Sequence, residues 1–217
     1  MAKTNRTYNE LEANIAENFR QRRDELEFYR KLVEKNQHKE WEGGVFAKNL
    51  LVFLYAHWEG FIKDAGESFL QYTSFQKIKY KDLNYGLLAI SKLDKVKDFL
   101  EGNVALKIKA LQVLFDSLEQ KAEIPYNYSI ATYSKLNMET LVEICLILGV
   151  DENRYLLKSA IIDEKLVRNR NIIAHGELIA FSPKQALSIY QGIFPILQDF
   201  KNDVLRKAST IEATKFL

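Results

Sequence analysis

Apolar residues recur every three or four positions along most of the chain, and this spacing places them on one face of an α-helix. The first such run extends from about Tyr8 to Val33, with charged residues between its apolar positions. Only Arg22 interrupts the stripe. The pattern therefore predicts a long amphipathic helix near the N-terminus.

A second apolar run follows Gly43 and Gly44, and we expect these two glycines to break the chain between two helices. This run has apolar residues on more than one face, so the helix should be central and packed on several sides. His57 and Glu59 are polar positions within it. Its main apolar positions are Ala47, Leu51, Leu54, Trp58, Phe61, Ala65 and Phe69.

The helical periodicity weakens in residues 75–137, which we expect to form a small inserted region, irregular or helical. Two short helices are predicted within it, at residues 92–100 and 105–118. Its many lysines are typical of a solvated face rather than a binding surface. We know no family that this segment resembles.

Three further helices are predicted after the insertion, each bounded by residues that favour helix ends. They run from Met138 to Leu148, from about Ser159 to His175, and from Ser182 onward with a kink at Pro195. The end signals are Asn137, Gly149, Gly176 and a capping box of Ser182, Pro183 and Gln185. The whole pattern predicts one all-α domain over residues 1–217, an up-and-down bundle of four to five core helices.

The composition and charge of the chain limit the classes of function that it can have. The chain has 217 residues, 47% of them hydrophobic, and a formal net charge of +2, so any nucleic-acid contact must come from a local patch. The single cysteine, Cys145, lies in an apolar run and is expected to be a core thiol. With no apolar leader and no membrane-length apolar window, we expect a cytoplasmic protein without a membrane partner.

The segment LVRNRNIIAHGE, residues 166–177, combines arginine, asparagine and histidine near a predicted helix end. At about 100° per residue, Glu164, Arg168, Asn171 and His175 lie within roughly 60° of one another, opposite the core face. Arg170 lies about 140° from His175, so an unbroken helix favours Arg168 as the partner of this histidine. The core face is expected to hold Ile162, Leu166 and Ile173.

This segment and LVFLYAHWEGFIK, residues 51–63, resemble the HEPN superfamily, in particular its bacterial branch of stand-alone MAE-type proteins. The family pattern of arginine, asparagine, three residues and histidine matches Arg170, Asn171 and His175. The resemblance thus implies Arg170 and His175 as catalytic residues with Asn171 supporting them. Arg168, which fits only the longest permitted spacer, is a reserve for phosphate binding. Distortion of the helix near Gly176, or donation across a dimer, could reconcile the two arginines.

The resemblance implies a metal-independent endoribonuclease without cofactor, of the toxin or anti-phage defence type, with RNA as substrate. One histidine per chain cannot easily be both acid and base, so a homodimer with a composite site is expected. An antitoxin or other regulatory protein is a further expected partner. The alternative is a non-catalytic HEPN module that binds RNA or a partner protein.

Polar residues outside the motif segment can have structural roles or functional ones. Arg22 is expected to be a paired or snorkelling arginine, with an RNA-facing role as the alternative. His57 is expected to be a core histidine, and His38 a solvated one. Glu59 could orient the motif helix from behind, and Glu164 could support the substrate; an ordinary carboxylate is the alternative for Glu59. No glycine-rich phosphate loop, GxSxG motif or metal-ligand cluster is present in the sequence.

Overall fold

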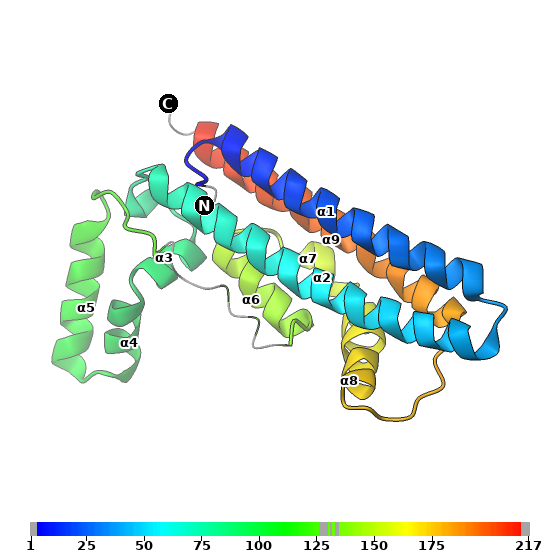
Figure 1. Ribbon diagram of the computed structural model, residues 1–217. Helices are drawn as coiled ribbons and strands as arrows, with labels where there is room; N and C mark the ends of the chain where they lie inside the picture. The colour runs from blue at the N-terminus through cyan, green and yellow to red at the C-terminus, as the bar shows by residue number, and fades with distance from the viewer. Residues whose placement is uncertain (1–3, 126–129, 131, 133–134, 214–217) are drawn as a thin grey trace.

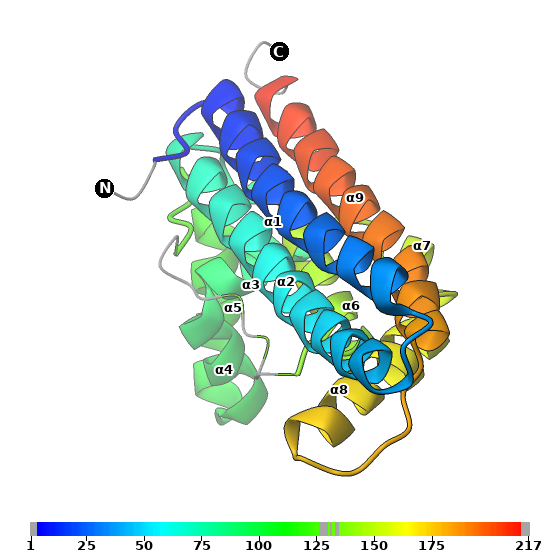
Figure 2. The same ribbon diagram turned by 45° about the vertical axis from the view of Figure 1, so that its right-hand side comes forward.

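Three long helices form the body of the molecule. The computed structural model describes residues 4–125, 130, 132 and 135–213. Helices α1 (Tyr8–Asn36), α2 (Glu40–Phe75) and α9 (Pro183–Ala213) lie side by side along their lengths (Figures 1 and 2). Within the described residues the only strand-like pairing is one isolated bridge, between Lys79 and Lys121. The predicted all-α fold class is therefore confirmed.

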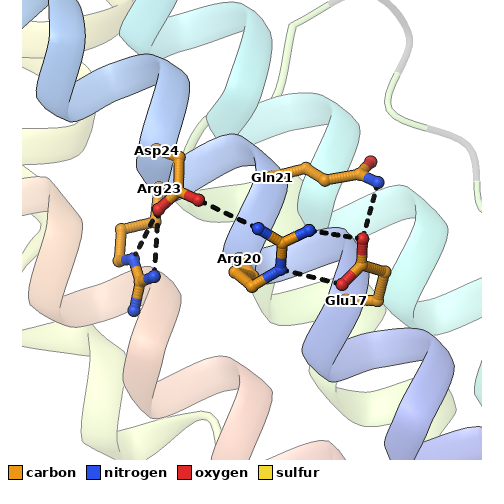
Figure 3. Close-up of polar contacts among 5 residues, drawn as sticks. All are labelled: Glu17, Arg20, Gln21, Arg23 and Asp24. Atoms are coloured by element: carbon orange, nitrogen blue, oxygen red, sulfur yellow. Dashed lines mark hydrogen bonds and ion pairs between the residues drawn. The ribbon is translucent and has the colours of Figure 1, made fainter.

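Helix α1 shows how local sequence defines an element. A capping box starts it, because the Thr7 hydroxyl accepts from the Glu10 backbone N–H while the Glu10 carboxylate accepts from the Thr7 N–H. Its buried face packs on α2 and α9. Its solvent face carries ion pairs one turn apart, in which Arg20 bridges Glu17 and Asp24 (Figure 3).

The expected break at Gly43 and Gly44 is wrong. Helix α2 begins at Glu40, so both glycines lie in its first turns. Gly43 is needed for close packing, since a Cβ there would lie 2.8 Å from the Asn36 carbonyl oxygen and 3.2 Å from the Pro183 Cγ. The glycine pair therefore marks a tight approach of three chain segments, and the turn between α1 and α2 lies just before it.

Residues 75–137 contain more regular structure than the periodicity indicated. A short 3₁₀ helix, η1 (Tyr80–Asp82), precedes helices α3 (Tyr85–Ser91), α4 (Leu93–Glu101) and α5 (Val104–Ser117). The two predicted helices correspond to α4 and α5, and α3 was missed. Helix α3 packs on α6, whereas α4 and α5 pack on each other and project from the body as a hairpin (Figure 1). Part of the predicted turn-rich segment, residues 126–129, 131 and 133–134, lies outside the described residues.

The C-terminal half follows the predicted end signals. Helix α6 (Met138–Leu148) has the expected Asn137 N-cap and ends at left-handed Gly149, with the four-residue α7 (Asn153–Leu156) after it. The motif helix consists of a π-helical part, η2 (Ala160–Val167), and an α-helical part, α8 (Arg168–Ala174). Helix α9 starts with the predicted capping box of Ser182 and Gln185 and contains Pro195 within it. No described helix is long and apolar enough to cross a membrane.

Candidate functional site

The motif helix rests on the body of the molecule through its core face. Ile162 and Leu166 are fully buried, and Ile173 is half-buried against the same core, as predicted. Asp163 adds a polar anchor, because its carboxylate accepts from the backbone N–H of Met138 at 2.8 Å. This bond joins the motif helix to the start of α6 and places residues before α6 beside it.

The π-helical start of the motif helix changes which residues share a face. A π turn contains more residues than an α turn, so each residue rotates less around the axis. This moves Asp163 towards the face of Asn171. Where the π-helical part meets the α-helical part, the Asn169 side chain donates to the carbonyl of Lys165 at 2.7 Å.

A Schellman motif ends the motif helix immediately after His175. Gly176 adopts a left-handed conformation, with φ of 75°. Its N–H donates to the Ile173 carbonyl, and the Glu177 N–H donates to the Ile172 carbonyl. His175 is therefore the capping residue of a well-defined terminus, with its imidazole exposed and no hydrogen bond to any described residue. No helical distortion is found at Gly176 itself.

An open pocket of about 560 Å³ lies beside this terminus. It is lined by Arg168, Asn171 and His175 from α8 and its cap. Neither the exposed Arg168 guanidinium nor the exposed Lys135 ammonium, also in the lining, forms an ion pair within the described part of the chain. The remaining lining residues are Asn137, Asp163, Val167, Ile172 and Glu177. The lining thus combines two cations and an imidazole with two carboxylates, of which Asp163 is engaged with the Met138 N–H. The unpaired Arg168 guanidinium is a group that can bind a phosphate.

Arg170 points away from this pocket and packs on α2. Its guanidinium carbon lies 3.9 Å from the centre of the Tyr55 ring, and its Nη1 donates to the Asn171 Oδ1 at 2.8 Å. Because the Asn171 oxygen accepts from Arg170, the amide NH₂ of Asn171 is left to donate into the pocket. Arg170 therefore orients a pocket residue without lining the pocket.

Tyr55 connects this arrangement to Glu59. The Tyr55 oxygen accepts from the Leu136 backbone N–H at 2.8 Å. Burial raises the pKa of Tyr55 to about 12, and the negative charge of Glu59 and a hydrogen bond to it act in the same direction. The positive charge of Arg170, whose guanidinium lies beside the ring, lowers this pKa. Glu59 thus reaches the motif helix only through Tyr55, and its orienting role stays a prediction.

The single chain brings together some of the predicted site residues and separates others. Arg168, Asn171 and His175 share the pocket, Arg170 and Glu59 do not line it, and Glu164 is exposed outside the pocket lining. Sequence analysis missed Lys135 and Asp163. Lys135 was counted among solvated lysines, and only the anchoring of α6 to the motif helix brings it near His175.

The remaining candidates have structural roles on the other side of α2. The Arg22 guanidinium donates to Asp64 at 2.6 Å and to Asn18 at 2.7 Å, so the prediction of a paired arginine is confirmed. His57 is buried as predicted, with its Nδ1 3.4 Å from Arg22 and its Nε2 3.2 Å from the Glu25 carboxylate. Burial and the Arg22 charge lower the pKa of His57.

Cys145 is a core thiol, as predicted. It is fully buried, and burial raises the pKa of its thiol to about 12. It therefore stays protonated and unreactive at neutral pH. Among the described residues, no three or more His, Cys, Asp or Glu side chains are grouped closely enough to hold a metal ion.

An all-α bundle with an arginine, an asparagine and a histidine beside the end of a late helix is the architecture of a HEPN-type domain. The sequence profile of the RiboL-PSP-HEPN family matches residues 17–206, and the chain belongs to this family. No curated protein and no solved structure matches the chain. The superfamily prediction is confirmed, while the narrower resemblance to the MAE-type branch stays a prediction.

Proposed function

We propose that the protein is a metal-independent endoribonuclease whose site is the pocket beside the motif-helix terminus. The observation that carries this proposal is the pocket that Arg168, Asn171 and His175 line together at a capped helix end. A ribonuclease of this kind needs a positive charge at the phosphate and a group that exchanges protons near neutral pH. Arginine and histidine supply these two functions.

The reaction that fits these groups is attack by the RNA itself. A base takes the proton of the 2′-hydroxyl, its oxygen forms a bond to phosphorus, and the 5′-oxygen leaves with a proton from an acid. The products are a 2′,3′-cyclic phosphate and a free 5′-hydroxyl. DNA lacks the 2′-hydroxyl and should not be cleaved. Arg168 and the Asn171 NH₂ would bind the phosphate oxygens, with Lys135 available for a neighbouring phosphate.

The two arginines receive different roles in this proposal. The family resemblance assigns catalysis to Arg170, whereas the geometry of the single chain favours Arg168, which lines the pocket with His175. We assign phosphate binding to Arg168 and positioning to Arg170, which holds Asn171 and contacts Tyr55. Glu59 would act with Tyr55 in the same positioning role.

A homodimer completes the proposed site, since one histidine per chain would otherwise have to be both acid and base. A two-fold axis beside the end of the motif helix would bring the two copies of His175 close together. Leu178, which is fully exposed shortly after this helix end, would give the interface an apolar contact.

The toxin or anti-phage role, the cytoplasmic location, the antitoxin-like partner and the MAE-type affiliation belong to this proposal and rest on the resemblance alone. The alternative function is a HEPN module that binds RNA or a partner protein without cleaving RNA. The same pocket supports it, because phosphate contacts from Arg168 and Lys135 alone would give RNA affinity.

The test is cleavage of mixed RNA by the purified protein in the presence of EDTA. His175→Ala should lower the rate about 10²- to 10⁴-fold, the usual cost of losing a general acid or base. His38→Ala is the matched control, since His38 is exposed and does not line the pocket. If the wild type binds RNA but leaves it intact, the binding module replaces the nuclease. An absolute requirement for Mg²⁺ would also contradict the proposal.

A further inference from the structure

The hairpin of α4 and α5 has an unusual concentration of exposed apolar side chains. It stands at the other end of α2 from the motif helix and away from the three long helices (Figures 1 and 2). Solvent exposure on this scale is costly for large apolar groups and typically marks an interaction surface. The exposed residues are Leu93, Phe99, Leu100, Val104, Leu106, Ile108, Leu111 and Phe115.

Four of these residues form a continuous stripe on α5. Val104, Ile108, Leu111 and Phe115 are spaced by four, three and four residues, the spacing of a coiled-coil seam. Their exposed fractions are 73%, 53%, 39% and 68%. The opposite face of α5 is covered, because Ala110 is only 1% exposed. The hairpin therefore presents a helix-packing seam, formed by these four residues, that the described part of the chain leaves exposed.

We propose that this seam pairs with the same seam of a second copy, antiparallel and around a two-fold axis. The spacing of four, three and four reads the same in both directions, which a two-fold axis requires. Val104 of one copy then meets Phe115 of the other, and Ile108 meets Leu111. Each contact joins a smaller side chain to a larger one.

The size of the side chains favours the antiparallel arrangement. Parallel pairing would place each stripe residue beside its own copy, Phe115 against Phe115 and Val104 against Val104. Antiparallel pairing instead matches larger side chains to smaller ones, and it also opposes the two helix dipoles. The charged residues Lys107, Lys109 and Asp116 lie off the stripe. The seam is thus complementary to itself in shape.

Disulfide trapping tests this pairing directly and without reference to RNA cleavage. Val104→Cys and Phe115→Cys proteins, mixed under reducing conditions and then oxidised, should form a cross-linked dimer on a non-reducing gel. Either protein alone should not, because identical positions would lie about 16 Å apart along the paired helices, whereas a disulfide needs Cα atoms about 4.4–6.8 Å apart. The native Cys145 is buried and does not compete.

Charge substitutions provide the control. In the mixed cysteine variants, Ile108→Glu with Leu111→Glu should abolish cross-linking. Both positions are exposed, so the fold should not need their apolar side chains. Lys109→Glu, on the same helix but off the seam, should leave cross-linking intact. Cross-linking of Val104→Cys with itself would overturn the antiparallel arrangement. Absence of any cross-linked species at tens of micromolar protein would overturn the proposal altogether.

Discussion

Arg168 and Arg170 are separated by one residue but belong to different environments. Arg168 is exposed in the pocket, while Arg170 is half-buried on Tyr55 and bonded to Asn171. On a helix, residues two positions apart cannot share a face. The two side chains can therefore be tested separately.

Arg168→Ala should lower kcat/KM roughly ten- to a hundredfold through loss of charged hydrogen bonds to phosphate, with Tm unchanged. Arg170→Ala should lower activity and also destabilise the fold by about 1 kcal/mol, because it removes the contact with Tyr55. RNA cleavage and thermal unfolding of both variants measure this difference. A larger rate loss in Arg170→Ala with an unchanged Tm would instead support the assignment implied by the family pattern.

His57 should make the stability of the protein depend on pH. Its pKa is lowered in the folded state, chiefly by burial and next by the charge of Arg22, with Glu25 opposing the shift. The unfolded chain then binds more protons than the folded one below about pH 6.5, so the free energy of unfolding decreases as pH falls through that value. Above it, this contribution is complete and constant.

Urea unfolding between pH 5 and 7 measures this effect. His57→Gln should flatten the dependence in this window even if the variant is less stable at every pH. His38→Ala, on the surface, should retain it. The lowered pKa of Glu27, whose main cause is the hydrogen bond from Arg30, acts at a lower pH, below about 4.5. An unchanged slope in His57→Gln would show that another group titrates.

At the scale of elements, neighbouring glycines at the start of α2 have different roles. A Cβ at Gly43 would meet backbone of the preceding turn at 2.8 Å, whereas a Cβ at Gly44 would have its nearest atom, the Phe181 carbonyl oxygen, at 3.8 Å. The first position has no room for a methyl group, and the second makes ordinary contact.

Gly43→Ala should therefore destabilise the protein by about 1–3 kcal/mol, the usual cost of overpacking. Gly44→Ala should stabilise it by up to about 1 kcal/mol, because alanine is the better helix former. Denaturant unfolding of the two variants gives the sign of each change. Equal effects would mean that helix propensity alone governs this region.

At the scale of the whole molecule, the two proposed interfaces lie at opposite ends of α2 (Figure 1). Two independent two-fold contacts on one chain generate a tetramer or an open chain rather than a dimer. The motif-helix interface can therefore be measured by itself only when the hairpin seam is disrupted.

In the Ile108→Glu and Leu111→Glu background, light scattering should show a dimer at micromolar concentration. Adding Leu178→Glu should convert it to a monomer, while adding Phe28→Glu, an exposed aromatic on α1, should not. Loss of the dimer should also abolish RNA cleavage. A monomer in the background variant that still cleaves RNA would contradict the composite site.

Sequence patterns determined the all-α fold, the helix ends at Asn137, Gly149 and Gly176, and the segment that carries the candidate site, because these depend on local periodicity and capping. Tertiary contacts decided the rest. Lys135 approaches His175 only because Asp163 holds the start of α6, and Arg170 leaves the pocket because Tyr55 takes its guanidinium. The tight approach at Gly43 likewise depends on packing between segments far apart in the chain. Neither this packing nor the π winding of η2 could be read from the local sequence pattern.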